Sequence, residues 1–372
     1  MASLQDYISQ LNLITEKLTK EEFSDKIKGS LFGMAIGDAL GARTEFVSKE
    51  KCIEFWQNKP LSMLGWECSM PNWEEGDWSD DTDQTLLIIL SWLALERVDD
   101  TDFGARLKHW LDHGFEELGD TGGCGVGAVT QEVISHEKFL ESPWIAALEV
   151  FVKRNCNLAR TGAIMRTHGL GMIDYEDLGA VVRSAILMAK ATHSDPRSVG
   201  SAVAVSVSIS LMLKGLRNIE QVLDIAYEIT RRAMEDYLNQ LDTMTSSIAA
   251  ELQNIYLQQK PNIILSSNPE ILRKYIRPSI ENDLIPLEEE GDGYTYKCMG
   301  VGFWGLSQND YSTMIRRVIT EGGDADTNAA VAGSLLGCRI GYSQLPQSLI
   351  LQLKHRVWLE NIADHLINKI YH

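Results

Sequence analysis

Residues 26–43 read KIKGSLFGMAIGDALGAR, and glycines recur in this stretch at every fourth position, at Gly29, Gly33, Gly37 and Gly41. In an α-helix, residues four apart lie one above the other, so this spacing places the four glycines on one helix face. A face without side chains allows a second backbone to come very close. The stretch therefore predicts a helix that packs tightly against another helix.

A second stretch near the C-terminus has the same spacing. Residues 328–342 read NAAVAGSLLGCRIGY and repeat the pattern with small residues at Ala329, Gly333, Gly337 and Gly341. Two such faces predict a closely packed central pair of helices. Glycines at this spacing also occur in membrane helices, but here Asp38 interrupts a stretch already too short to span a bilayer.

Helical periodicity also dominates the remainder of the chain. Residues 84–97 (QTLLIILSWLALER) are apolar nearly all round, which is typical of a buried helix. Residues 177–191 and 198–215 show apolar spacings of three and four, and 219–259 are long enough for two helices. Because alternating strand patterns are nearly absent, we predict an all-α fold, a compact multi-helix bundle.

We expect a single domain over residues 1–372, because strong motifs occur at both ends. Residues 260–293 differ from their surroundings. Four prolines interrupt this segment, and an acidic run with glycines (EEEGDG) closes it. We interpret it as a connecting excursion over the surface, interrupted at Pro261, Pro269, Pro278 and Pro286.

Composition narrows the function classes. The formal net charge of −18 argues against a nucleic-acid partner, because phosphate backbones are bound by clustered Lys and Arg. Six cysteines without CxxC or metal-ligand spacing are typical of reduced thiols. No signal peptide and no membrane span is recognisable, so we expect a cytoplasmic protein. A self-contained helical domain favours a monomer.

Two acidic clusters suggest metal chemistry. Residues 77–85 (DWSDDTDQT) place Asp80 and Asp81 after Ser79 at a predicted helix start. Helix capping and the helix dipole explain one or two of these acids. A bound cation would offset the repulsion among the others. This motif alone leaves both interpretations open.

The second cluster favours the metal interpretation. In TEGGDADTNAAVAG (320–333), Asp324, Asp326 and Thr327 follow two glycines that allow a sharp turn. Two carboxylates and a hydroxyl are hard oxygen donors, which Mg²⁺ prefers. Two such clusters together predict a metal site shared between distant loops.

Three further motifs are weaker. The glycine-rich GDTGGCGVGAV (119–129) has no GK[ST] and no preceding strand, so a mobile turn and a phosphate-cradling loop both remain open. Residues 159–171 (ARTGAIMRTHGLG) contain Arg166 in a small, apolar setting, which more often has a structural role. His193, in ATHSDPR (191–197), lies at a probable helix end.

Together these motifs resemble the ADP-ribosylglycohydrolase family over residues 29–342. Matching the family's [ST]DDT and GGDxDT motifs at once is highly specific. The matching elements are GSLFGMAIGDALGARTEF (29–46), WSDDTD (78–83), GGCGVGAV (122–129), TGAIMRTHGLG (161–171), THSDPR (192–197), GYTYKCMG (293–300) and GGDADTNAAVAG (322–333).

The resemblance implies an all-helical domain with two Mg²⁺ ions, or Mn²⁺, at the floor of a cleft. By motif match the metal ligands are Ser79, Asp80, Asp81, Asp324, Asp326 and Thr327. The residues implied in ADP-ribose binding are Gly122, Gly123, Gly125, Gly127, Gly162, Met165, Arg166, His193 and Tyr294. One position departs from the family pattern, because Thr161 stands where relatives usually have Asn and supplies a hydroxyl without the second group of an amide.

The resemblance also implies an activity: a Mg²⁺-dependent hydrolase that releases ADP-ribose from a protein side chain or a small molecule. Cleavage at the anomeric carbon needs an activated water, with Glu45 or Asp324 as the catalytic proton acceptor. A catalytically silent ADP-ribose-binding protein and a two-metal phosphoesterase are the alternatives. The linkage stays open among arginine, serine, an ester and others.

Overall fold

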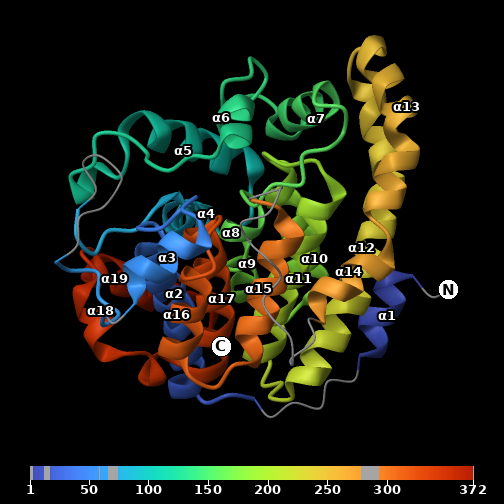
Figure 1. Cartoon of the computed structure of the whole chain (residues 1–372). Coiled ribbons are helices and arrows are strands. Elements are labelled where there is room, and N and C mark those ends of the chain that lie inside the picture. The colour runs from blue at the N-terminus through green and yellow to red at the C-terminus, as the bar shows by residue number, and fades with distance from the viewer. Residues whose placement is uncertain (1–2, 12–16, 58, 66–73, 278–292, 372) are drawn as a thin grey trace.

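The computed structural model describes residues 3–11, 17–57, 59–65, 74–277 and 293–371, and these residues are almost entirely helical (Figure 1). The α-helices are α1 (Leu4–Gln10), α2 (Lys20–Gly41), α3 (Lys49–Trp56), α4 (Asp80–Leu95), α5 (Asp100–His113), α6 (Ala128–Ile134), α7 (Pro143–Lys153), α8 (Ile164–Thr167), α9 (Leu170–Ile173), α10 (Leu178–Lys190), α11 (Pro196–Leu213), α12 (Ile219–Met244), α13 (Ala250–Ser266), α14 (Pro269–Ile276), α15 (Thr295–Ser307), α16 (Tyr311–Ile319), α17 (Ala325–Ile340), α18 (Gln347–Gln352) and α19 (Arg356–Ile370). Short 3₁₀ helices follow α5, α12 and α17: η1 (Glu116–Leu118), η2 (Thr245–Ser247) and η3 (Tyr342–Gln344).

The all-α prediction is confirmed. Within the described residues β-pairing is limited to two isolated bridges, Val47 with Gly323 and Arg160 with Tyr294. The stretch 219–259, expected to be long enough for two helices, contains α12 and most of α13.

The predicted central pair consists of α2 and α17, which pack antiparallel at backbone contact. A Cβ on Gly33 would lie 2.3 Å from the carbonyl oxygen of Gly333, and a Cβ on Gly37 would lie 2.2 Å from that of Ala329. Real Cβ atoms do not approach oxygens this closely, so only glycine fits at these positions. The bare faces therefore serve helix packing, as the spacing predicted.

This packing sets the position of one end of α17. Gly41, the last residue of α2, lies against the backbone of Asp326, where an added Cβ would be 2.4 Å from the Asp326 Cα. The C-terminal end of α2 thus adjoins the first turn of α17. The acidic cluster that begins α17 is held beside the loop that leaves α2.

Two apolar helices complete the core around this pair. The first ten residues of α4, Asp80–Ile89, are buried except Asp83, so this helix has no solvent face there. All of α11 is buried. By length and composition α11 is apolar enough to cross a membrane, but it lies wholly inside the helical assembly, as core helices of globular domains do.

The remaining helices form the periphery. In Figure 1, α5, α6 and α7 run across the top of the molecule, and α18 and α19 lie beside α2 at the lower left. α13 projects upward at the right, and Tyr256 and Ile263 are the residues of this helix that are buried.

The segment 260–293 was predicted to be a connecting excursion over the surface, but its first part is helical. Its first residues are the end of α13, followed by α14. Pro261 lies inside α13, so the expectation that this proline interrupts the chain is wrong. Most of α13 is exposed, so water can bond the carbonyl that loses its amide partner to the proline ring. Residues 278–292 lie outside the described residues.

We predict that Gly33→Ala destabilises the protein although alanine favours helices. The new methyl group would overlap the Gly333 carbonyl, and neither backbone has a rotamer that relieves the overlap. Overpacking of this kind outweighs the gain of about 1 kcal/mol in helix propensity, so we expect a loss of at least about 2 kcal/mol in the free energy of unfolding. Urea denaturation measures it.

Gly169→Ala is the matched control, because the nearest atom to its added Cβ is 3.5 Å away. We expect this variant to change the free energy of unfolding by less than about 1 kcal/mol. Equal losses in the two variants would contradict the steric explanation.

Candidate active site

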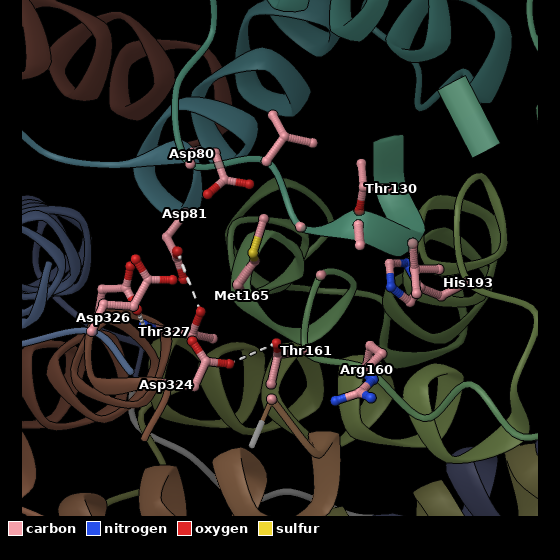
Figure 2. Close-up of a pocket in the computed structure, with 18 of the residues that line it drawn as sticks. Asp80, Asp81, Thr130, Arg160, Thr161, Met165, His193, Asp324, Asp326 and Thr327 are labelled. Atoms are coloured by element: carbon pink, nitrogen blue, oxygen red, sulfur yellow. Dashed lines mark hydrogen bonds between the residues drawn. The ribbon is translucent and has the colours of Figure 1, made fainter. Parts of the chain in front are cut away.

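One cavity of about 580 Å³ brings the two acidic clusters together. Asp80 and Asp81 reach it from the start of α4, and Asp324, Asp326 and Thr327 reach it from the start of α17. Figure 2 shows these side chains gathered on one side of the cavity, with His193 and Arg160 on the opposite side and Met165 between them. The clusters are separated by more than 240 positions in the chain, and the α2–α17 packing makes them neighbours.

Ser79 does not line this cavity. It is the buried N-cap of α4, and its hydroxyl accepts a hydrogen bond from the Asp81 amide at 3.4 Å. The same hydroxyl donates to Asp81 Oδ2 at 3.1 Å. In this structure Ser79 therefore caps the helix and orients a carboxylate.

Asp38 is a member of the acidic cluster that the sequence analysis did not assign. It is fully buried on α2 and accepts hydrogen bonds from the Ser79 amide at 2.9 Å and from the Thr82 hydroxyl at 2.6 Å. It therefore ties the start of α4 to the central helix. Its sequence signal was a charged residue inside a glycine-striped, apolar helix, which is unusual for a buried position.

The start of α17 is built by a sharp turn. Gly322 and Gly323 both have positive φ angles, 78° and 68°, which glycine adopts without strain. Asp326 Oδ1 accepts from the Thr327 amide at 2.9 Å, and the Thr327 hydroxyl donates to Asp81 Oδ2 at 3.3 Å. This last bond joins the two acidic clusters directly.

The carboxylates are arranged so that they repel one another. Burial raises the pKa of Asp80 well above its ordinary value, and the charge of Asp38 raises it further. Burial and the same neighbour also raise the pKa of Asp81. Asp81 Oδ1 is buried and has no hydrogen-bond partner. A buried carboxylate oxygen without a donor is unfavourable unless a cation supplies the missing charge.

Two sets of three carboxylates have the dimensions of a metal site. One ligand oxygen from each of Asp38, Asp81 and Asp326 lies within 4.8 Å of the others, and the same holds for Glu45, Asp324 and Asp326. Oxygen donors at this density fit Mg²⁺ or Mn²⁺. Of the predicted ligands, Asp81, Asp324 and Asp326 thus belong to carboxylate sets that could hold a divalent cation, whereas Asp80 is in neither set.

Glu45 lies half-buried on the loop that follows α2 and lines the cavity. Burial raises its pKa from 4.5 to about 7, with a further contribution from the charge of Asp324. A carboxyl group with this pKa exchanges a proton readily near neutral pH. The next residue, Phe46, also lines the cavity. Its φ is 53°, a strained value for a non-glycine residue, and 63% of it is exposed.

Only part of the glycine-rich loop lines the cavity. Gly125 and Gly127 line the cavity, and a Cβ on Gly125 would lie 2.8 Å from Asp80 Oδ1. Gly122 and Gly123 lie outside the lining. Gly123 is needed for packing instead, because a Cβ there would lie 2.7 Å from the Trp110 ring.

Arg166 is fully buried beneath the cavity and does not line it. Its guanidinium donates to Gln84 Oε1 at 2.9 Å, to two backbone carbonyls and to the Thr192 hydroxyl at 2.7 Å. Burial lowers its pKa to about 9, so it stays charged at neutral pH. Its position is that of a structural cation, in contrast to the ligand contact that the resemblance implied.

Thr192 connects Arg166 to His193, which does line the cavity. The Thr192 hydroxyl accepts from Arg166 and lies within hydrogen-bond distance of His193 Nδ1, at 2.8 Å. The imidazole is neutral, because burial and the Arg166 charge lower its pKa to about 3. Gly162 lies against the ring, where a Cβ would be 2.7 Å from Cε1.

Tyr294 is half-buried and is not among the lining residues. Its ring packs in an aromatic cluster with Tyr275 and Tyr296, and the Arg197 guanidinium lies 5.8 Å from its centre. Lining residues that the sequence analysis did not assign include Phe46, Thr130, Arg154 and Arg160. Arginine is a common phosphate ligand, but the sequence alone does not show that these arginines face the cavity, so only the three-dimensional arrangement identifies the four residues.

Comparisons with known proteins identify the family of this chain. The family model described as ADP-ribosylglycohydrolase matches residues 19–372. The chain belongs to the ADP-ribosylglycohydrolase family. It is therefore an enzyme of the class that hydrolyses glycosyl bonds, as the motifs implied.

Individual relatives are distant but cover most of the chain. An ADP-ribosylarginine hydrolase of Serratia proteamaculans is 23% identical and covers 94% of this chain and 81% of its own length. An ADP-ribosyl-[dinitrogen reductase] glycohydrolase of Rhodospirillum rubrum is 20% identical, with coverages of 91% and 94%. A solved structure titled ADP-ribosylglycohydrolase-related protein complex superposes with a TM-score of 0.64 at 23% identity, covering 94% of this chain and 99% of its own.

We predict that the protein without divalent cations loses thermal stability as the pH rises from about 6.5 to about 8, above the range in which the lowered pKa values of the buried His168 and His193 act in the opposite direction. A carboxyl group whose pKa is higher in the folded state binds a proton on folding, so its stabilising contribution is lost as the pH rises through the folded pKa. For Glu45 this window runs from 4.5 to about 7. The raised pKa values of Asp80, Asp81 and Asp326 act in the same direction.

Thermal unfolding in EDTA, and then with Mg²⁺, measures this dependence. We expect Mg²⁺ to raise the melting temperature by several degrees at about pH 8 and to have little effect at about pH 5. Glu45→Gln should flatten the pH dependence in EDTA. A melting temperature that rises in EDTA between about pH 6.5 and about pH 8 would contradict the prediction.

Proposed function

We propose that this protein is a Mg²⁺-dependent hydrolase that cleaves the glycosidic bond between ADP-ribose and a carrier, releasing ADP-ribose. The carrier is a protein side chain or a small molecule. The observation that carries the proposal is the single cavity with buried carboxylates at one end and neutral or cationic donors at the other. The names of the relatives support an ADP-ribosylated substrate.

The acidic end fits divalent cations. Asp81 Oδ1 is buried without a partner, and the neighbouring acids have raised pKa values. We assign the ligands to Asp80, Asp81, Asp324, Asp326 and Thr327, with Ser79 at the edge of the site. When bound, the cations supply positive charge that holds the ribose hydroxyls and lowers the pKa of water.

The opposite end suits the anionic part of ADP-ribose. His193, whose neutral imidazole carries one N–H donor, lies at this end, and Arg160 stands beside it (Figure 2). Gly125 and Gly127 bring bare backbone to the wall between the two ends. Hydrogen-bond donors and a guanidinium are groups that bind phosphate oxygens. A substrate held here has its distal ribose toward the carboxylates.

Glu45 is our candidate for the proton acceptor. Water attacks the anomeric carbon, and the bond from that carbon to the carrier breaks through a transition state with oxocarbenium character. The carrier leaves with the bonding electron pair and takes up a proton from solvent, so the products are ADP-ribose and the protonated carrier. Glu45 takes the proton from water, and its pKa of about 7 suits this exchange at neutral pH. Asp324, the alternative acceptor, has one of its oxygens engaged by Thr161. This favours Glu45 for the proton transfer.

Phe46 is placed to meet the carrier. Its backbone amide donates to Gly323 O at 2.8 Å, which holds the residue in its strained conformation beside Glu45. Strain of this kind persists when the surroundings enforce it and is common at ligand sites. An exposed ring next to the proposed proton acceptor offers the carrier a flat apolar surface.

The activity test is release of ADP-ribose from arginine-, serine- and ester-linked substrates, with Mg²⁺ and then with EDTA. We expect release to require the metal. Asp324→Asn removes a ligand charge from the site and should lower kcat by at least about a hundredfold. Mass spectrometry of the products identifies the bond that breaks.

The same measurement separates the alternatives. AMP among the products would show that a phosphate bond is cleaved and would favour a phosphoesterase. ADP-ribose binding without cleavage of any substrate in the panel would favour a catalytically silent binding protein. Neither alternative has an observation of its own in the structure.

We predict that Phe46→Ala weakens the use of carriers and leaves ADP-ribose binding unchanged. Loss of a ring contact should raise KM for an ADP-ribosylated protein by roughly two- to tenfold, since such contacts contribute about 0.5–1.5 kcal/mol. Leu140→Ala is the control, because Leu140 is 55% exposed and lies outside the cavity lining. An unchanged KM for every carrier would contradict the assignment.

A further inference from the structure

Thr161 links the acidic end of the cavity to a loop that contributes no carboxylate. It lies between α7 and α8, and its hydroxyl donates a hydrogen bond to Asp324 Oδ2 at 2.8 Å. Figure 2 shows this bond crossing from the loop to the start of α17. Both residues line the cavity and are nearly buried, with 9% of Thr161 and 6% of Asp324 exposed.

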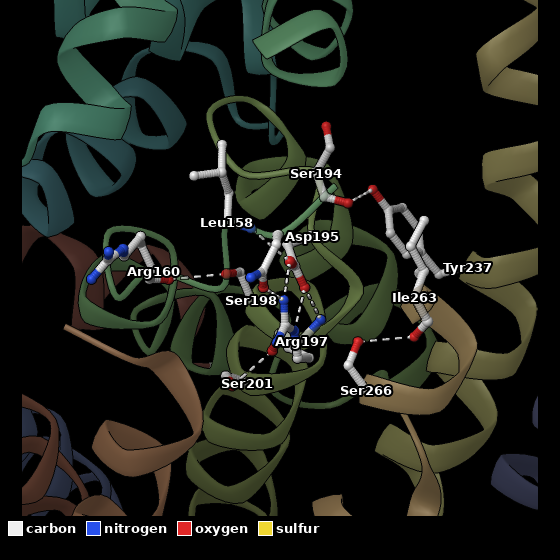
Figure 3. Close-up of polar contacts among 11 residues, drawn as sticks. Leu158, Arg160, Ser194, Asp195, Arg197, Ser198, Ser201, Tyr237, Ile263 and Ser266 are labelled. Atoms are coloured by element: carbon white, nitrogen blue, oxygen red, sulfur yellow. Dashed lines mark hydrogen bonds and ion pairs between the residues drawn. The ribbon is translucent and has the colours of Figure 1, made fainter. Parts of the chain in front are cut away.

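The loop on the N-terminal side of Thr161 is anchored by the start of α11. Asp195, the N-cap of α11, accepts from the Leu158 amide at 3.1 Å. Arg197 donates to both oxygens of Asp195 and also to Asn157 Oδ1 at 2.8 Å. Figure 3 shows Leu158 and Arg197 converging on Asp195.

A second anchor lies directly beside Thr161. The Ser198 hydroxyl donates to the carbonyl of Arg160 at 2.9 Å (Figure 3). The backbone immediately before Thr161 is thus held by a contact that does not involve Asp324. A donor held independently of its acceptor can orient that acceptor.

The chemistry of threonine makes this contact directional. A hydroxyl carries one proton, and Thr161 gives it to the Asp324 carboxylate. Its remaining lone pairs can only accept, so toward the cavity it suits a donor such as a ligand hydroxyl rather than a phosphate oxygen. Gly293 adjoins the pair, and a Cβ there would lie 3.4 Å from Asp324 Oδ2. Gly293 therefore lies beside the bond without crowding it.

We infer that Thr161 is a positioning residue for Asp324, which fixes the orientation of this carboxylate before metal and substrate bind. The inference deepens the proposed function and rests on it only for the catalytic readout. Thr161 acts through Asp324 and takes no part in bond cleavage. The hydroxyl of Thr161 thus serves the acidic end of the cavity.

Thr161→Val tests the inference, because valine has nearly the same shape and no hydroxyl. Thr161→Ser is the matched control, since it keeps the hydroxyl and loses the methyl group. Calorimetric titration with Mn²⁺ alone, without substrate, measures the metal affinity. We expect Thr161→Val to bind Mn²⁺ about tenfold more weakly and Thr161→Ser to bind it nearly as the wild type does, as for other residues that orient metal ligands.

Kinetics add a second readout. We expect Thr161→Val to lower kcat with little change in KM, and Thr161→Ser to restore kcat. Melting temperatures identify a variant that fails to fold. In that case Thr161→Ala, which removes the same hydroxyl and adds no bulk, replaces Thr161→Val in both measurements.

Two outcomes would overturn the inference. One is wild-type Mn²⁺ affinity in Thr161→Val. The other is an equal loss of Mn²⁺ affinity in Thr161→Val and Thr161→Ser, which would show that the packing of the threonine side chain, and not its hydroxyl, determines the affinity. Failure of the proposed function is distinguishable. If the wild type cleaves no substrate but Mn²⁺ affinity still falls in Thr161→Val and recovers in Thr161→Ser, the positioning role stands.

Discussion

The backbone contact between α2 and α17 is the constraint on which the site depends. Sliding one helix past the other by a single turn would move its residues by about 5.4 Å. That displacement is larger than the 4.8 Å within which the ligand oxygens of Asp38, Asp81 and Asp326 lie. The metal-binding geometry therefore exists in one register of this helix pair. Asp38 extends the constraint to α4, because it binds the first turn of that helix from within α2.

A stripe that repeats every four residues does not by itself select one register, because a slip of one turn would again place small residues in contact. Side chains at other positions remove this degeneracy. The hydroxyls of Ser30 and Ser334 lie 2.7 Å apart in a buried hydrogen bond, which a slip would break. At the far end of the pair, Asp25 accepts from the Ser343 amide at 2.8 Å. Small residues allow the close approach, and these polar contacts determine where along the helices it occurs.

Local sequence was sufficient for the features that depend on neighbouring residues. The glycine spacing predicted the central pair, and the short acidic motifs predicted which carboxylates gather. It was insufficient where the direction of a side chain depends on the tertiary fold. Arg166 was assigned to the ligand by motif position, but its four hydrogen bonds hold it beneath the cavity. Phe46 and Asp38 were overlooked. Phe46 is an exposed side chain that lines the cavity beside Glu45, and Asp38 accepts a hydrogen bond from Ser79, 41 positions further along the chain.

The buried carboxylates at the acidic end of the cavity lower the stability of the folded protein, and the contacts around them offset part of this loss. Each buried carboxylate raises the pKa of the others, so their ionised forms destabilise the fold without cations. Backbone amides and hydroxyls offset part of this effect and leave at least one oxygen, Asp81 Oδ1, without a donor. The rigid α2–α17 pair keeps these side chains close together against their repulsion, which protonation or a bound cation relieves. A softer scaffold would let the carboxylates move apart, so close backbone packing lies directly beside the repelling acids of the candidate cation site.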